Sequence, residues 1–170
     1  MVKNKRFLIL LVLAALLALL FARAVSQESP APQVTFTSLK GEKIPMQSLR
    51  GKVVLVNFWA TSCVGCIHEM PRMIDTYRKY NNQGLETIAV AMSYDPPNYV
   101  LNYTEKNALP FKVALDVQGG IARAFGDVQL TPTTFVVDKR GNIIKRILGE
   151  PDFAQLDRLI EEKLAAPVGA

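Results

Sequence analysis

Cysteine and histidine are scarce in this sequence, which contains two cysteines and one histidine among 170 residues. A structural zinc site commonly takes four ligands in two pairs, and these side chains cannot supply them. Covalent haem attachment needs a histidine directly after the second cysteine, and Ile67 occupies that position. Neither cysteine lies near the amino terminus, so a lipid-modified cysteine there is excluded too.

Most of the chain also lacks an excess of positive charge. Four of the 20 lysines and arginines lie in the first 24 residues, which contain no acidic residue. That leaves 16 basic residues against 15 acidic ones, so the remainder of the chain is close to neutral. Because nucleic-acid binding relies on a clustered basic face, the composition predicts no nucleic-acid partner.

The amino-terminal residues are typical of a targeting segment. Lys3, Lys5 and Arg6 precede an uncharged apolar run over residues 7–22. This run is slightly long for the core of a signal peptide and slightly short for an ideal membrane span. Two interpretations stay open: a signal-anchor ended by Arg23, which we favour, and a signal peptide cut at the small residues around Arg23. Both predict that the rest of the chain is exported, and the anchor would tie it to the membrane.

The sequence divides into three regions: a signal-anchor or signal peptide over 1–24, a Ser- and Pro-rich linker over 25–33, and a domain over 34–166. In the domain, residues 53–60 form an almost continuous apolar run, which is typical of a strand covered on both faces. The pattern predicts further strands over 34–39, 85–93, 111–116, 133–138 and 143–149, and helices over 64–83, 96–109, 119–126 and 152–166. This alternation predicts an α/β fold with a central sheet and helices on both faces.

The two cysteines, Cys63 and Cys66, stand between the buried strand and the long helix. Cys63 should lie at the helix N-terminus, where unpaired N–H groups and the helix dipole favour a thiolate. Cys66, one turn later, would be less exposed and could resolve a mixed disulfide at Cys63. A purely structural disulfide would close too short a loop to add much stability. We therefore expect both cysteines to be catalytic, with a redox-active disulfide and neither a cofactor nor a metal. A soft copper site that uses these thiols and a nearby methionine stays open as the alternative.

The stretch VLVNFWATSCVGCIHEMP resembles the active-site segment of the thioredoxin superfamily, and most of all the exported thiol-disulfide oxidoreductases of the TlpA/ResA type. The resemblance rests on the tryptophan-led Cys-x-x-Cys from Trp59 to Cys66, on Pro71 in the helix, and on QLTPTTFVVDKRGNII. It implies a thioredoxin fold with a central mixed sheet, an amino-terminal strand extension, and a helix-strand insertion over 94–111.

The resemblance also implies three substrate-binding residues. Pro132 would be a cis proline that faces the cysteines, and the backbone of Thr131 would pair with an extended substrate. The Thr131 hydroxyl would donate to the Cys63 sulfur and favour its thiolate. Trp59 would lie at the core edge, as a lid beside the sulfurs.

Proton handling is where the sequence departs from minimal thioredoxins. They carry a buried Asp in the strand before the cysteines, and Asn57 occupies that position here. Asn cannot accept the proton of the second thiol, so Glu69 and Asp95 are the candidates. Helical spacing suggests that Glu69 faces solvent, as does His68. Asp95 matches the acid that many relatives carry after the second strand only with a shift of one position.

The resemblance implies a periplasmic reductase of disulfides in partner proteins, such as apocytochrome c during cytochrome c maturation. Its electrons would come from a membrane thiol donor, because the periplasm is kept oxidising. We expect a monomer. The alternatives are a disulfide oxidase or isomerase, and a copper-delivery protein that uses the same thiols. A thiol peroxidase is disfavoured, because Ala60 and not Thr lies three residues before Cys63.

Overall fold

The computed structural model describes residues 29–167, so the predicted targeting segment over 1–24 lies outside the described residues. Within residues 29–167, no helix has the length and apolar character that a membrane crossing requires. The same residues contain no cluster of three or more His, Cys, Asp or Glu side chains that could hold a metal ion.

A six-stranded mixed sheet forms the centre of the fold, in the order β1-β8-β7-β4-β5-β6. β4 runs parallel to β5 and β5 to β6, whereas β7 is antiparallel to both β4 and β8. The strands are β1 (Ser29–Pro30), β4 (Val53–Trp59), β5 (Leu85–Ala91), β6 (Lys112–Leu115), β7 (Thr133–Val137) and β8 (Asn142–Leu148). Every residue of β4 is buried, as expected for a strand covered on both faces.

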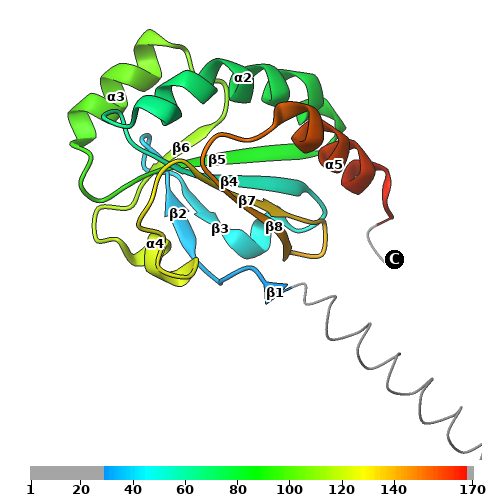
Figure 1. Ribbon diagram of the computed structural model, residues 1–170. Helices are drawn as coiled ribbons and strands as arrows, with labels where there is room; N and C mark the ends of the chain where they lie inside the picture. Colours follow the sequence, from blue (N-terminus) through cyan, green and yellow to red (C-terminus); the bar gives the residue numbers. More distant parts are fainter. Residues whose placement is uncertain (1–28, 168–170) are drawn as a thin grey trace, which may run out of the picture.

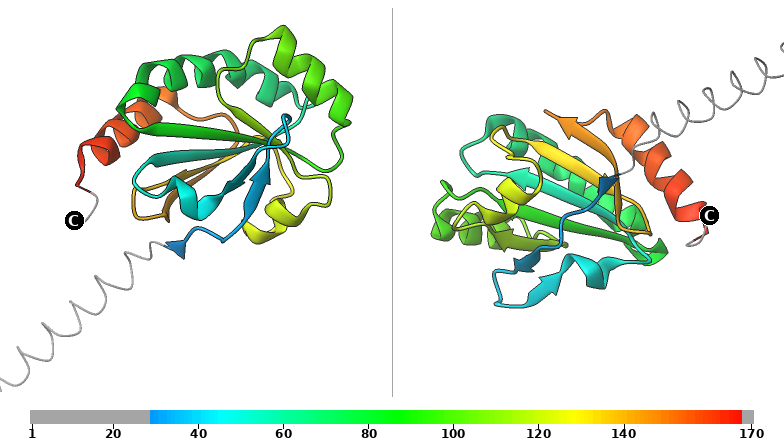
Figure 2. Two further views of the ribbon diagram at one scale, coloured as in Figure 1. Left: turned by 180° about the vertical axis from the view of Figure 1, so that it is seen from behind. Right: turned by 90° about the horizontal axis from the view of Figure 1, so that it is seen from below.

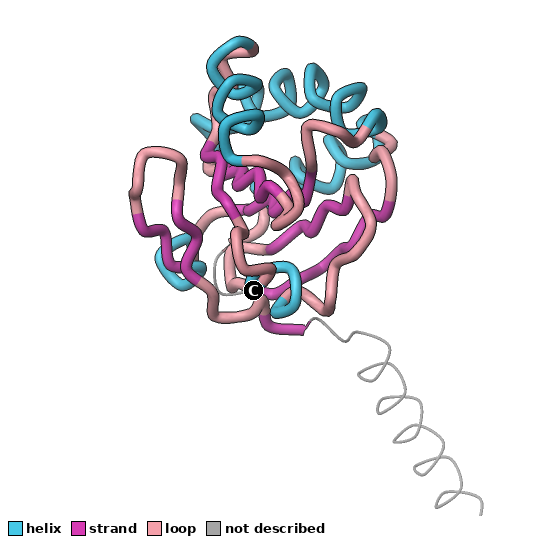
Figure 3. Tube along the Cα trace, turned by 90° about the vertical axis from the view of Figure 1, so that its left-hand side faces the viewer, coloured by secondary structure: helices cyan, strands magenta, loops and turns pink. Residues whose placement is uncertain are grey.

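Two layers cover the sheet (Figure 1). One layer consists of α2 (Val64–Tyr80), α3 (Pro97–Lys106) and α5 (Phe153–Ala165), and the other of α4 (Gly120–Ala124), η1 (Met46–Leu49) and the hairpin of β2 (Thr35–Thr37) and β3 (Lys43–Pro45). A short helix, η2 (Asn81–Gln83), links α2 to β5. Figure 2 shows both layers from behind and from below, and Figure 3 shows most helical turns on one side of the strands.

Period-two alternation along β4 decides which side chains reach which layer. Val54, Val56 and Phe58 join the core under α4 and the hairpin, whereas Leu55 and Trp59 join the core under α2 and α5. Residue 57 has the same parity as Leu55 and Trp59, so it faces α2. This places the side chain of residue 57 under the helix that begins at the cysteines.

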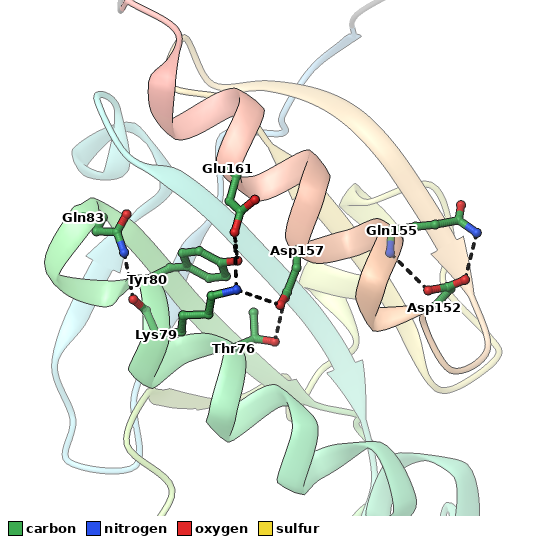
Figure 4. Close-up of polar contacts among 8 residues, drawn as sticks. All are labelled: Thr76, Lys79, Tyr80, Gln83, Asp152, Gln155, Asp157 and Glu161. Atoms are coloured by element: carbon green, nitrogen blue, oxygen red, sulfur yellow. Dashed lines mark hydrogen bonds and ion pairs between the residues drawn. The ribbon is translucent and has the colours of Figure 1, made fainter.

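Polar contacts fix α5 against the second half of α2 (Figure 4). Thr76 Oγ1 donates to Asp157 Oδ1 over 3.2 Å, and Tyr80 Oη donates to Glu161 Oε1 over 2.6 Å. Lys79 Nζ lies 3.4 Å from Asp157 and 3.3 Å from Glu161. These contacts fix α2 at its C-terminal end, which is the end opposite to the cysteines.

The structure confirms the predicted strands and helices with small shifts at their ends. Two boundaries differ from the expectation. The predicted linker ends earlier, because Ser29 pairs with Ile143 at the sheet edge and Ala31 is buried. Pro30 fits there because an edge strand tolerates a missing N–H. The inserted helix is α3, and the strand that accompanies it begins at Lys112, just after the predicted insertion.

Candidate active site

The cysteines form a disulfide at the start of α2. Cys63 is the N-cap residue, and its Sγ accepts a hydrogen bond from the backbone N–H of Cys66 over 3.2 Å. Cys63 is partly exposed, whereas Cys66 is fully buried against the core. A partner can therefore reach Cys63 but not Cys66. The helix N-terminus directs N–H groups at the Cys63 sulfur, which favours its thiolate once the disulfide is reduced.

The loop before β7 lies against the Cys-x-x-Cys turn. The Thr131–Pro132 peptide bond is cis, as predicted. A Cβ atom added to Gly65 would lie 3.4 Å from Pro132 Cδ and 3.4 Å from Glu150 Oε1, so the proline faces the turn between the cysteines. An added Cβ would be at the short end of ordinary van der Waals contact with both groups.

The expected hydrogen bond from the Thr131 hydroxyl to the Cys63 sulfur is absent among the described residues. Thr131 Oγ1 instead lies 3.3 Å from Tyr94 Oη. The backbone N–H and C=O of Thr131 make no hydrogen bond within residues 29–167. Because both backbone groups are unpaired, an extended polypeptide could pair with them.

Trp59 lies deeper than expected. Its side chain is fully buried in the same core cluster as Cys66, with its ring centroid 5.3 Å from that of Tyr103. It therefore lies inside the core and not at the core edge, and it offers no surface to a partner in this state. The burial follows from the position at the end of β4, where α2 and α3 both cover the strand.

Glu69 is the largest departure from the sequence expectation. Helical spacing suggested a solvent-facing side chain, which is wrong: Glu69 is 1 % exposed. It lies one turn after Cys66, and residues three apart on a helix are neighbours on one face. Its Oε1 accepts a hydrogen bond from Asn57 Nδ2 over 2.9 Å, and Oε2 has no partner among the described residues.

Burial disfavours the charged form of Glu69 and raises its pKa to about 7. The hydrogen bond from Asn57 lowers the pKa and the negative charge of Glu150 raises it, but both effects are smaller than that of burial. Glu69 is therefore a buried acid, one helical turn from Cys66, that can exchange a proton close to neutral pH.

Asp95, the second candidate for proton handling, anchors the loop before the cysteines. Its Oδ2 accepts from the backbone N–H of Thr61 over 2.7 Å and its Oδ1 from the Thr61 hydroxyl over 2.6 Å. Both carboxylate oxygens are thus engaged two residues before Cys63. This geometry favours an anchoring role for Asp95 over the predicted role in proton handling.

We expect Asp95→Ala to lower the free energy of unfolding by about 2 kcal/mol, because it leaves the Thr61 N–H unpaired. Asp95→Asn should recover most of this loss, since its amide oxygen can still accept from that N–H. Both variants should keep the pH profile of disulfide exchange. Urea unfolding and exchange assays between pH 5 and 9 measure the two effects, and an altered pH profile in Asp95→Asn would restore the proton-handling role.

Two polar residues at the rim, Glu150 and His68, make a contact that the sequence did not predict. Glu150, after β8, approaches Gly65, and its Oε2 lies 2.7 Å from His68 Nδ1. His68 is exposed, as expected, with 78 % of its side chain accessible. A contact that joins positions 82 residues apart leaves no local signal in the sequence.

The chain is similar to known proteins over most of its length. The model of the Redoxin family matches residues 26–160. The thiol-disulfide oxidoreductase ResA of Bacillus thuringiensis subsp. konkukian is 38 % identical over 132 residues, which cover 78 % of this chain and 75 % of the relative. ResA of Bacillus subtilis is 33 % identical over 126 residues, 74 % of this chain and 69 % of the relative.

Solved structures agree with this relationship. A candidate thioredoxin from Neisseria meningitidis superposes with a TM-score of 0.74 at 39 % identity and covers 79 % of this chain and 90 % of its own. A thioredoxin-family thiol:disulfide interchange protein from Chlorobium tepidum has a TM-score of 0.74 at 28 % identity, with coverages of 82 % and 98 %. The chain therefore belongs to the Redoxin family, as a thiol-disulfide oxidoreductase of the TlpA/ResA type within the thioredoxin superfamily.

Proposed function

We propose that this oxidoreductase reduces disulfides of partner proteins in the periplasm, and that apocytochrome c is among them. The observation that carries the proposal is the pairing of a partly exposed Cys63 at a helix N-terminus with a fully buried Cys66. One sulfur can attack a partner, and the other can react only with its neighbour. A membrane-held thiol donor would return the disulfide to the dithiol, because the compartment itself is oxidising.

The proposed reaction has two exchange steps. The Cys63 thiolate attacks one sulfur of the partner disulfide, which breaks that bond, forms a mixed disulfide and releases the other partner sulfur as a thiolate. The Cys66 thiol then loses its proton to Glu69, and its thiolate attacks Cys63 Sγ. The Cys63–Cys66 disulfide forms and the second partner sulfur leaves as a thiolate. Two electrons pass to the partner, whose thiolates are protonated by water or by Glu69.

The partner would bind beside Pro132. The unpaired backbone of Thr131 supplies one donor and one acceptor for an extended segment. Four exposed apolar or aromatic side chains lie in the same part of the fold. Val64 lies within the Cys-x-x-Cys turn, Tyr94 against Thr131, Leu130 before Pro132, and Leu148 opposite Thr133. They would contact the side chains that flank the partner's cysteine, and the protein would act as a monomer.

The reduction potential of the Cys63–Cys66 pair tests the direction of electron flow. We expect a value near that of thioredoxin, about −270 mV, and rapid reduction of insulin by the dithiol form. A value near about −120 mV would instead indicate an oxidase. Titration of the reduced protein with Cu(I) tests the copper-delivery alternative, which predicts tight binding and little insulin reduction.

A further inference from the structure

The buried amide of Asn57 links three elements under the active site. Asn57 on β4 is fully buried, and its Nδ2 donates to Glu69 Oε1 on α2 over 2.9 Å and to Thr134 Oγ1 on β7 over 2.9 Å. Both hydrogens of the amide nitrogen are therefore used. The reversed amide orientation would turn both hydrogens away from these acceptors, whereas in the orientation described only the amide oxygen Oδ1 is left without a partner among the described residues.

The charge state of Glu69 does not change what Asn57 must do. An amide N–H can donate to the oxygen of a carboxylate and also to the carbonyl oxygen of a neutral carboxylic acid. Because Oε1 is occupied by this donor, the proton of a neutral Glu69 resides on Oε2. Oε2 is buried and has no hydrogen-bond partner among the described residues.

We infer that Asn57 is a positioning residue of the exchange reaction: it holds Glu69 by Oε1 and so makes Oε2 the oxygen that takes up and returns the proton of Cys66. The inference rests on the proposed role of Glu69. Around Glu69 lie Cys66 on the same helix face, the Asn57 amide from β4, which Thr134 of β7 holds in turn, and the charge of Glu150 from the loop after β8.

Asparagine suits this position better than aspartate. An aspartate at 57 would place a second carboxylate within hydrogen-bond distance of Glu69, and two buried carboxyl groups at that distance share one proton and titrate as a pair. With an amide at 57, a single acid titrates beneath the cysteines. The position therefore sets how many protons the site exchanges as well as where the proton lies.

The test measures the Glu69 titration directly, in oxidised full-length protein, by carboxyl carbon NMR, with Glu69→Gln to assign the signal. In Asn57→Ala the carboxylate loses its donor, so the titration midpoint should rise by about one pH unit. Thr134→Val should raise the Glu69 midpoint by less, because this change removes only the second acceptor of the Asn57 amide and leaves the donor to Glu69 in place. Thr87→Val is the matched control, since Thr87 is also a buried threonine of the sheet but its hydroxyl makes no hydrogen bond to Asn57 or to any other described residue.

An unchanged Glu69 midpoint in folded Asn57→Ala overturns the inference. If Asn57→Ala does not fold, an unchanged midpoint in Thr134→Val, or an equal shift in Thr87→Val, overturns it. The pH profile of disulfide exchange should shift to higher pH together with the Glu69 midpoint. Failure of the proposed function is distinguishable: Glu69→Gln would then leave the exchange profile unchanged, whereas Asn57→Ala would still move the Glu69 midpoint.

Discussion

Cys66→Ser is expected to trap a mixed disulfide between Cys63 and a partner protein, whereas Cys63→Ser should abolish exchange. The partly exposed Cys63 can still attack a partner in the first variant, but no second thiol remains to release it. In the second variant the remaining Cys66 is fully buried and cannot reach a partner. We expect the exchange rate of Cys63→Ser to fall by roughly a thousandfold or more, as is usual when a nucleophile is removed.

Non-reducing electrophoresis with a disulfide-containing protein such as insulin detects the trapped species, and peptide mapping identifies the cysteine that forms it. Ser62→Ala is the matched control, because Ser62 is an exposed residue beside Cys63 and carries no thiol. Capture through Cys66 in the Cys63→Ser variant, or no capture through Cys63 in Cys66→Ser, would reverse the assigned roles.

Glu69→Gln should change how stability depends on pH. The folded protein holds the Glu69 pKa at about 7, above its ordinary value of 4.5, so the folded state binds this proton more tightly than the unfolded chain does. The contribution of Glu69 is therefore fully present below pH 4.5 and is lost as the pH rises to 7. The variant has no such loss, so the difference between its free energy of unfolding and that of wild type should increase by about 3 kcal/mol, in favour of the variant, from pH 4 to pH 9.

Urea unfolding of the oxidised proteins across this pH range measures the difference. Glu162→Gln is the matched control, because it makes the same chemical change on a side chain that is 67 % exposed. A constant difference between Glu69→Gln and wild type from pH 4 to 9 would show that Glu69 titrates normally and would remove it from the proton-transfer step.

Much of the fold was predictable because its strongest signals are local. The unbroken apolar run of β4 and the spacing of Met70, Met73 and Tyr77 each specify one element without reference to the rest of the chain. The cis peptide before Pro132 was predictable only through resemblance, since a Thr-Pro pair before a strand is usually trans.

The interior of the site was harder to predict because it depends on contacts between elements. Glu69 lies three residues after Cys66 and four before Met73, so it shares their buried face, and the prediction from helical spacing that it faces solvent was wrong. Only the amide of Asn57, which comes from the neighbouring strand, explains how the helix tolerates that acid. The two-residue β1 was missed for another reason, since a Ser-Pro pair carries no strand periodicity.

The attachment point of the amino-terminal segment has a practical consequence. Ser29 pairs with Ile143 near the beginning of β8, whereas Leu148, at the other end of that strand, lies opposite Thr133 beside the Pro132 loop. About 17 Å of strand thus separates Ile143 from Leu148. A bead, a fusion partner or a lipid surface joined through residue 29 would hold the molecule at the end of β8 that is far from the Pro132 loop. The reactive sulfur would then face away from the attachment point, toward incoming proteins.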